Sequence, residues 1–265
     1  MPRRAVLSDE QRMALLALPD DETTLVQHWT LSEDDLAIIV RRRRPHNRLG
    51  FAIQLCALRY PGRLLRPGEL IPDTPLAFVA AQLQIAPEVL ADYATRGPTR
   101  YGPLDALREG FGFTQFSRPL RAALQEWLLP IALTTTSGAG LARSLLGECR
   151  RRRIIVPGIS SVERMVAQAL LDAERHVAEH LTRGLETGQR RLLDALLLPH
   201  AGTNLSGLGW VRQPSGKPGR KTFAVIIRRL ALLRDIGIDP DIAAGIHPER
   251  LRRLCQEGAR LTAQH

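Results

Sequence analysis

The segment at residues 47–60 most restricts how this chain can fold. It predicts a helix whose large apolar residues, among them Leu49, Phe51 and Leu55, fall on several faces, so most of that helix has to be buried in a core. Four arginines (Arg41, Arg42, Arg43 and Arg44, the first arginine quartet) stand directly before it, followed by Pro45. A helix that must be buried therefore begins beside dense positive charge, which favours a folded domain that presents arginines to a polyanion.

Helical periodicity continues along nearly the whole chain, with no strand-like alternation of useful length. Capping signals, such as Ser8 with Gln11 and Ser160 with Glu163, open several of the predicted helices. We therefore expect an all-α protein made of tandem small helical domains, with helix-turn-helix-like elements joined by short linkers.

Breaks in the helical pattern divide the chain into three expected domains, at residues 1–115, 116–200 and 201–265. The composition, 44% hydrophobic and 24% charged residues, is an ordinary globular balance. The last predicted helix meets no stop signal before His265. This indicates a fragment of a longer protein, with a frayed natural terminus as the alternative.

Positive charge is concentrated in the second part of the chain. The net charge is +10, yet residues 1–115 hold 14 basic and 14 acidic side chains, whereas residues 116–265 hold 23 and 13. Only Lys217 and Lys221 are lysines. Arginine offers a planar fork suited to phosphates, although a GC-rich coding sequence also favours arginine. The charge predicts a phosphate-rich partner.

Cysteine spacing and hydropathy argue against several other classes of protein. The three cysteines lie far apart without a CxxC pair, so we expect neither a disulfide framework nor a cysteine zinc site. The N-terminus lacks the apolar run of a signal peptide. No apolar stretch reaches the roughly 20 residues of a membrane span. We therefore expect a cytoplasmic protein with no membrane partner.

A second arginine quartet (Arg150, Arg151, Arg152 and Arg153) sits between two predicted helices. Helix, basic turn and helix resemble a DNA-reading arrangement, with a turn longer than that of a tight helix-turn-helix. We expect these arginines to bind DNA together with Ser160, Ser161 and Arg164 at the start of the next helix. Alternatively, the arginines complement the end of a helix and are solvated.

Two further groups are candidate DNA contacts. At the first arginine quartet, His46, Asn47 and Arg48 open the buried helix, where exposed amide groups favour phosphate. In the flexible loop at residues 214–221, we expect contacts from Lys217, Arg220 and Lys221. A mobile linker is the alternative for this loop.

No set of residues predicts catalysis. The acidic residues mostly lie at helix starts, where capping accounts for them, and no carboxylate triad or Ser/His/Asp arrangement has supporting context. His176 and His180 match the short pattern H-x-x-E-H, but a solvated helix face explains them better. We therefore predict no catalytic residue, no metal site and no cofactor.

Several stretches of the chain resemble the N-terminal region of the Tn-three family of replicative transposases. The match is collinear and covers nearly the whole chain. It comprises TLSEDDLAIIVRRRRPHNRLGFAIQLCALRYPGR at 30–63, LLP at 128–130 with AL at 132–133, RRRRIIVPGIS at 150–160 with ER at 163–164, WVRQP at 210–214, LALLRDIG at 230–237, HPERL at 247–251 and EGAR at 257–260.

The resemblance implies a function in DNA transposition and recombination. In this family the N-terminal region binds the terminal inverted repeats of the transposon, a transposable element, and a later RNase H-like domain carries the acidic triad and divalent metals. The implied function is sequence-specific binding of double-stranded transposon-end DNA, without enzyme activity in this fragment. The implied location is the bacterial nucleoid. The alternative is an assembly module, in which exposed apolar faces of the last helices join two copies in a homodimer.

Overall fold

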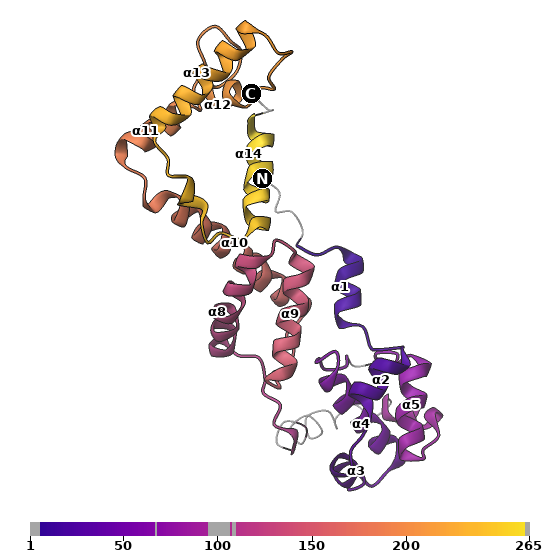
Figure 1. Ribbon diagram of the computed structural model, residues 1–265. Helices are drawn as coiled ribbons and strands as arrows, with labels where there is room; N and C mark the ends of the chain where they lie inside the picture. The colour runs from indigo at the N-terminus through magenta and orange to yellow at the C-terminus, as the bar shows by residue number, and fades with distance from the viewer. Residues whose placement is uncertain (1–5, 67, 95–106, 108–109, 263–265) are drawn as a thin grey trace. The chain divides into compact units, whose positions relative to one another are not determined.

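The computed structural model describes residues 6–66, 68–94, 107 and 110–262. These residues form helices and no strand, which confirms the predicted all-α class. They group into two compact units (Figure 1). Unit 1 contains residues 1–128 and 137–169, and unit 2 contains residues 129–136 and 170–265.

The helices follow one another with short connections. Unit 1 begins with α1 (Asp9–Leu16), α2 (Glu22–Trp29), α3 (Glu33–Ile39), α4 (Pro45–Arg59), α5 (Asp73–Leu83), η1 (Pro87–Leu90) and α6 (Ala91–Ala94). Next come α8 (Arg118–Thr134), α9 (Gly138–Arg151) and α10 (Ile159–Arg183), of which α8 and α10 contribute residues to both units. Unit 2 continues with α11 (Thr187–Ala195), α12 (Gly207–Arg212), α13 (Arg220–Ile236), η3 (Pro240–Ala243) and α14 (Pro248–Thr262).

Local capping sets where the first helices begin. The Ser8 side chain accepts a hydrogen bond from the Gln11 amide and the Gln11 side chain accepts one from Ser8, so the predicted capping box is confirmed. Ser32 and Asp35 form the same reciprocal pair before α3. Asp35 is only 3% exposed and also pairs with Arg59 of α4 at 2.6 Å. One carboxylate thus caps α3 and ties it to the end of α4.

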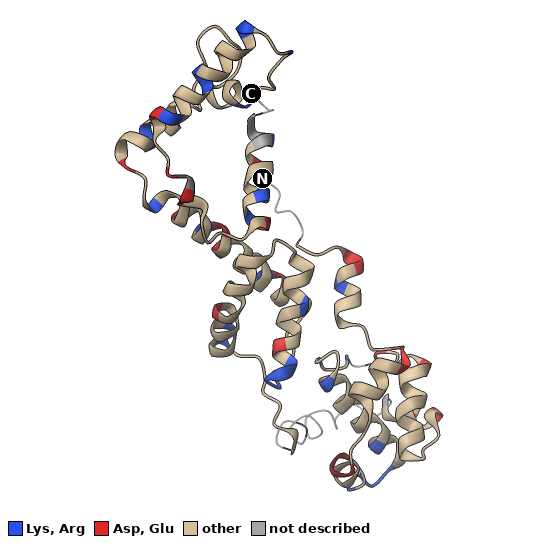
Figure 2. Cartoon of the chain, in the orientation of Figure 1, with Lys and Arg blue, Asp and Glu red and all other residues tan. Residues whose placement is uncertain are grey.

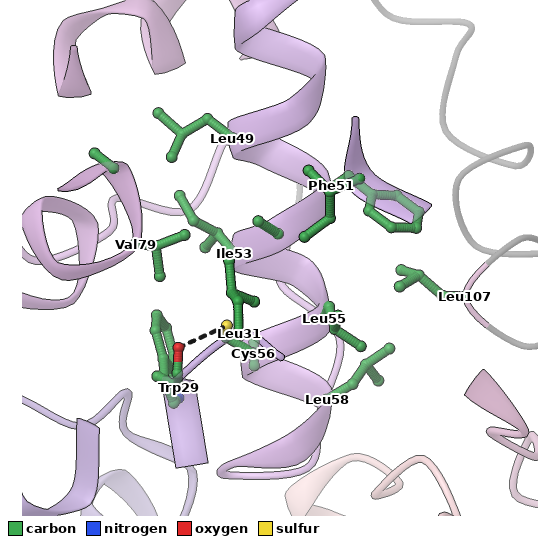
Figure 3. Packing of buried hydrophobic residues seen from close by; sticks show 14 of the residues in the cluster. Trp29, Leu31, Leu49, Phe51, Ile53, Leu55, Cys56, Leu58, Val79 and Leu107 are labelled. Atoms are coloured by element: carbon green, nitrogen blue, oxygen red, sulfur yellow. Dashed lines mark hydrogen bonds between the residues drawn. The ribbon is translucent and has the colours of Figure 1, made fainter. Parts of the chain in front are cut away.

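Helix α4 is the centre of the unit 1 core, as its apolar sequence predicts. Nine of its fifteen residues are buried, and Trp29 of α2 and Val79 of α5 pack against it (Figure 3). The Sγ of Cys56 donates a hydrogen bond to the Trp29 carbonyl oxygen at 3.6 Å. Burial raises the pKa of the Cys56 thiol to about 12, so Cys56 is an inert core residue.

The connector between α9 and α10, residues 152–158, is part of this core and not a free turn. Ile154, Ile155 and Val156 are buried. Their backbone amides donate hydrogen bonds to the carbonyl oxygens of Cys149, Thr114 and Gly62, respectively. These three bonds and the buried side chains fix the path of the chain across unit 1.

The predicted capping box at the start of α10 is wrong. The helix begins at Ile159, one residue before the expected cap Ser160. Glu163, the expected reciprocal partner, instead accepts a hydrogen bond from Arg12 of α1 at 2.7 Å. A long-range partner therefore takes the carboxylate that the local pattern assigned to the cap.

A buried arginine organises unit 2. Arg250 of α14 is 2% exposed, and its guanidinium donates hydrogen bonds to the carbonyl oxygens of Ala132 and Thr135 at and just beyond the end of α8. These oxygens would otherwise lack helical partners. Next to it, Glu249 accepts hydrogen bonds from the amide and hydroxyl of Thr136. The start of α14 therefore caps the end of α8.

The two units are groups of residues in contact, whereas the three expected domains are a statement about parts that fold independently. The three-domain division therefore stays a prediction.

Candidate nucleic-acid interface

The first arginine quartet occupies the short link between α3 and α4. Arg41, Arg43 and Arg44 are exposed, and within the described part of the chain none of the three makes a printed ion pair or side-chain hydrogen bond. Pro45 is the first residue of α4, and that first turn contains no acidic side chain. Proline suits this position because the first helical amide needs no partner there. Three cations are therefore free to meet an anion at the start of a helix, where the helix dipole also favours one.

Arg42 and Arg48 hold this link in place. The guanidinium carbon of Arg42 lies 4.4 Å from the centre of the Phe51 ring, a cation–π distance. The Nε of Arg48 donates a hydrogen bond to the Arg42 carbonyl oxygen at 2.7 Å. His46, Asn47 and Arg48 are half-buried in the first turn of α4. Of the predicted contacts in this group, the three exposed arginines are the most accessible.

The second arginine quartet makes far more internal contacts. Arg151 and Arg152 both donate to Glu148, three and four residues earlier on α9, at 2.6–2.7 Å. The Glu148 side chain is 5% exposed and that of Arg151 is 69% exposed. Hydrogen bonding from Arg151, with further help from Arg152 and opposed by burial, lowers the pKa of Glu148 to about 2. Glu148 is therefore ionised at neutral pH and offsets charge in the quartet.

Arg150 faces the core of unit 1. Its guanidinium lies 4.9 Å from the centre of the Tyr60 ring, and its Nη1 donates a hydrogen bond to the Pro61 carbonyl oxygen at 3.3 Å. The other face of Tyr60 belongs to a stacked pair with His28, whose ring centre is 4.9 Å away. Burial lowers the pKa of Arg150. Arg150 therefore packs α9 against α4 as well as carrying charge.

Arg153 has an unusual backbone. Its φ of 51° lies in the left-handed region, which costs energy for a residue other than glycine. Its Nη1 donates to the Phe111 carbonyl oxygen at 2.9 Å, and its own carbonyl oxygen accepts from the Thr114 amide. The surrounding hydrogen bonds hold the residue in this conformation.

Two phenylalanines link the two arginine quartets. Phe51 contacts Arg42 on one side, and its ring centre lies 6.4 Å from that of Phe111. Phe111 is the residue whose carbonyl oxygen binds Arg153. The structure therefore brings the quartets, which are about a hundred residues apart in sequence, to the two ends of one row of aromatic contacts.

The start of α10 holds the next predicted group. Ser160 and Arg164 are exposed and Ser161 is half-buried. Arg164 donates hydrogen bonds to the Ser160 carbonyl oxygen and the Ser161 hydroxyl, both at 3.2 Å. The three residues are therefore one local cluster at the surface.

The basic loop is shorter than predicted. Arg220 and Lys221 form the first turn of α13, and only Lys217 remains in the loop. The Lys217 carbonyl oxygen accepts a hydrogen bond from the Thr222 hydroxyl at 2.8 Å, so side-chain capping extends the helix toward the loop. All three cations are exposed. Figure 2 shows basic residues along α13, at the end of α9 and between α3 and α4.

A pocket in unit 1 was not anticipated from the sequence. It is lined by Leu58, Arg59, Phe111, Phe113, Arg150 and Arg153 and has a volume of about 200 Å³. Only Arg150 and Arg153 belonged to the predicted site. No spacing rule connects residues 58–59 with 111–113, because they meet only through the fold. The structure tests none of the predicted DNA contacts directly, so they stay predictions.

Metal and membrane features were examined over the same described ranges. They contain no group of three or more His, Cys, Asp or Glu side chains placed to hold a metal ion. Among them no single helix is long and apolar enough to cross a membrane, although Asp73–Leu83 and Pro87–Tyr93, bent by 103°, pass together by length and composition alone.

An all-helical fold with exposed arginines defines a class of basic helical proteins, and similarity to known proteins places the chain within it. A family described as "Domain of unknown function (DUF4158)" matches residues 6–169. The transposases for transposons Tn21 and Tn3926 of Escherichia coli are 37% and 38% identical to the chain, each over 99% of its length. The transposase for transposon Tn501 of Pseudomonas aeruginosa is 35% identical, also over 99% of the chain.

The chain therefore belongs to the Tn-three family of transposases and carries the DUF4158 domain. The family resemblance noted in the sequence is confirmed. The chain spans 26% of the length of the transposases for Tn21, Tn3926 and Tn501.

Proposed function

We propose that this chain binds double-stranded DNA at the ends of a transposon and recognises the terminal inverted repeat. The observation that carries the proposal is the set of exposed arginines Arg41, Arg43 and Arg44 at the start of α4. Arginine guanidinium groups match phosphate oxygens in charge and geometry. The similarity to transposases supports DNA as the polyanion.

In this proposal the contacts divide by role. The first arginine quartet binds phosphates and sets the position of the protein on the duplex. The cluster of Ser160, Ser161 and Arg164, at the exposed start of α10, is the candidate for reading base edges. Lys217, Arg220 and Lys221 add a further phosphate contact in unit 2. Cutting and joining of strands belongs, by this proposal, to the part of the relatives that this chain does not match, and the chain acts at the bacterial nucleoid.

Fluorescence anisotropy titrations test the proposal. The chain is titrated into a labelled duplex carrying the terminal inverted repeat and into a shuffled duplex, at several salt concentrations. We expect tighter binding to the repeat and a steep fall of affinity with salt, because each neutralised phosphate contributes a slope of about −0.9 in log K against log salt. Equal affinity for the two duplexes would remove sequence recognition, and a flat salt dependence would remove the phosphate contacts.

A second function is favoured by the surface of α13. Phe223 is 65% and Leu230 60% exposed, and Ile227 lies between them at helical spacing. Such an apolar stripe marks a contact surface. We propose that this stripe joins two copies of the chain. Light scattering with and without end DNA tests this: a dimer that Phe223→Ser with Leu230→Ser converts to a monomer supports it, and a wild-type monomer at all concentrations contradicts it.

A further inference from the structure

The pocket formed by α4, α9 and residues 111–113 has one charged and one apolar side. Arg59, Arg150 and Arg153 supply the charged side, and Leu58, Phe111 and Phe113 the apolar side. All six residues belong to unit 1. A phosphate alone would use only the charged side, whereas a nucleotide offers an anion and an apolar ring or sugar together.

The arginines of the pocket are not equally neutralised. Arg59 pairs with the buried carboxylate of Asp35 at 2.6 Å. Arg150 and Arg153 each bind a backbone carbonyl oxygen, and within the described ranges neither has a carboxylate partner in an ion pair. Two positive charges therefore line the pocket without an internal anion. Such charges favour a bound anion more strongly when they are partly shielded from water.

The geometry of the charged side is set before any ligand binds. Arg150 is held between Tyr60 and the Pro61 carbonyl oxygen. Arg153 is fixed by its bond to Phe111 and by the bridge between Thr114 and Ile154. Preorganised groups lose little freedom on binding, which increases affinity.

The apolar side contains an accessible aromatic residue. Phe113 is 8% exposed and belongs to the core, as does Leu58. Phe111 is half-buried and packs only partly against the core. Aromatic side chains stack on any nucleic-acid base, because every base has a π-face.

We propose that this pocket binds one nucleotide unit of DNA, with its phosphate at Arg150 and Arg153 and its base or sugar against Phe111. The inference rests on the proposed DNA binding and makes it more specific. A base stacked in a duplex cannot enter such a pocket, so the nucleotide has to be unpaired or turned out of the helix. The pocket would therefore recognise a distorted or frayed position in the DNA.

Titration calorimetry of the full chain with deoxyadenosine 5′-monophosphate, deoxyadenosine and inorganic phosphate tests the inference. We expect saturable binding of the monophosphate, at least about fivefold tighter than that of either part, because stacking and charge act together. Arg153→Gly removes one cation, and glycine accepts the positive φ at this position without strain. This variant should weaken the monophosphate about tenfold.

Two further variants separate the sides of the pocket. Phe111→Leu keeps an apolar side chain but removes the ring, so it should weaken the monophosphate and leave inorganic phosphate unchanged. Arg151→Gln, next to the pocket but not lining it, is the matched charge control and should change affinity less than about twofold. Thermal unfolding of each variant confirms that it is folded.

The outcomes separate the inference from the proposed function. Equal binding of monophosphate and inorganic phosphate, no saturable binding, or equal losses in Arg153→Gly and Arg151→Gln would overturn the nucleotide pocket. Any of these results together with tight, salt-dependent binding of the end duplex would leave the proposed DNA binding intact. Pocket binding without duplex binding would instead contradict the proposed function.

Discussion

The two arginine quartets have the same composition but different surroundings. In the first, Arg41, Arg43 and Arg44 are exposed between two helices. In the second, Arg150 packs on Tyr60, and Arg151 and Arg152 bind Glu148. A run of four arginines in a sequence is therefore not one kind of site: a carboxylate one turn earlier and an apolar connector afterwards turn the second run partly into structure.

The strongest test of this contrast removes the three exposed cations together. In the variant Arg41→Gln, Arg43→Gln, Arg44→Gln, we expect affinity for end DNA to fall on the order of 100-fold at low salt, and the salt slope to fall by about 2.7, since each phosphate contact contributes about 0.9. Stability should change by less than about 0.5 kcal/mol, because these are surface side chains. Anisotropy and chemical unfolding measure the two quantities.

The control for that test carries the same loss of charge elsewhere. Arg183, Arg191 and Arg252 are exposed residues of α10, α11 and α14, and none of them is a proposed DNA contact. Changing all three to Gln should lower affinity much less than the quartet variant. If both variants lose the same affinity, net charge and not position explains the binding.

The second quartet should respond to its carboxylate. Glu148→Ala removes three hydrogen bonds with Arg151 and Arg152, so we expect a loss of about 1–2 kcal/mol in the free energy of unfolding. Affinity for DNA should rise modestly, since two arginines lose their internal anion. Urea unfolding checks the first effect and anisotropy the second. Unchanged stability would show that the quartet is as solvated as the first one.

Acid should reveal the same carboxylate. The pKa of Glu148 is lowered from 4.5 to about 2 in the folded chain. A lowered folded pKa contributes stability that is present above the unfolded pKa and is lost as the pH falls toward the folded value. We therefore expect Glu148→Gln to reduce the loss of stability between about pH 4.5 and 2 relative to the wild type. Parallel pH curves for the two chains would contradict the assignment.

The smallest expected effect concerns the backbone of Arg153. Glycine adopts a φ of 51° without the steric cost that arginine bears. Arg153→Gly should therefore leave the free energy of unfolding unchanged or raise it by up to about 1 kcal/mol, although the bond to Phe111 is lost. A clear loss of stability would show that the guanidinium contact matters more than the strain.

The sequence predicted the parts of this fold that depend on local signals. Capping at Ser8 and the many-sided apolar pattern of α4 placed a helix start and the core correctly. Glu148 stands three and four residues before Arg151 and Arg152, the spacing of helical ion pairs. That signal was present and could have identified the pairing.

Other features depend on residues that meet only through the fold. The partner of Glu163 is Arg12, which lies 151 residues away. The burial of Ile155 is due to the core around α4. The pocket combines α4, α9 and Phe111, and periodicity within one helix carries no information about such partners.

The bond between Arg250 and Ala132 has a consequence for the order of folding. The two residues are separated by 118 positions. A ribosome adds about 5–20 residues per second, so the end of α8 waits roughly 6–24 s for the arginine that caps it. Unit 1, completed at residue 169, can be assembled during that interval. During synthesis, the carbonyl groups at the end of α8 therefore remain open to water or to a chaperone until α14 arrives.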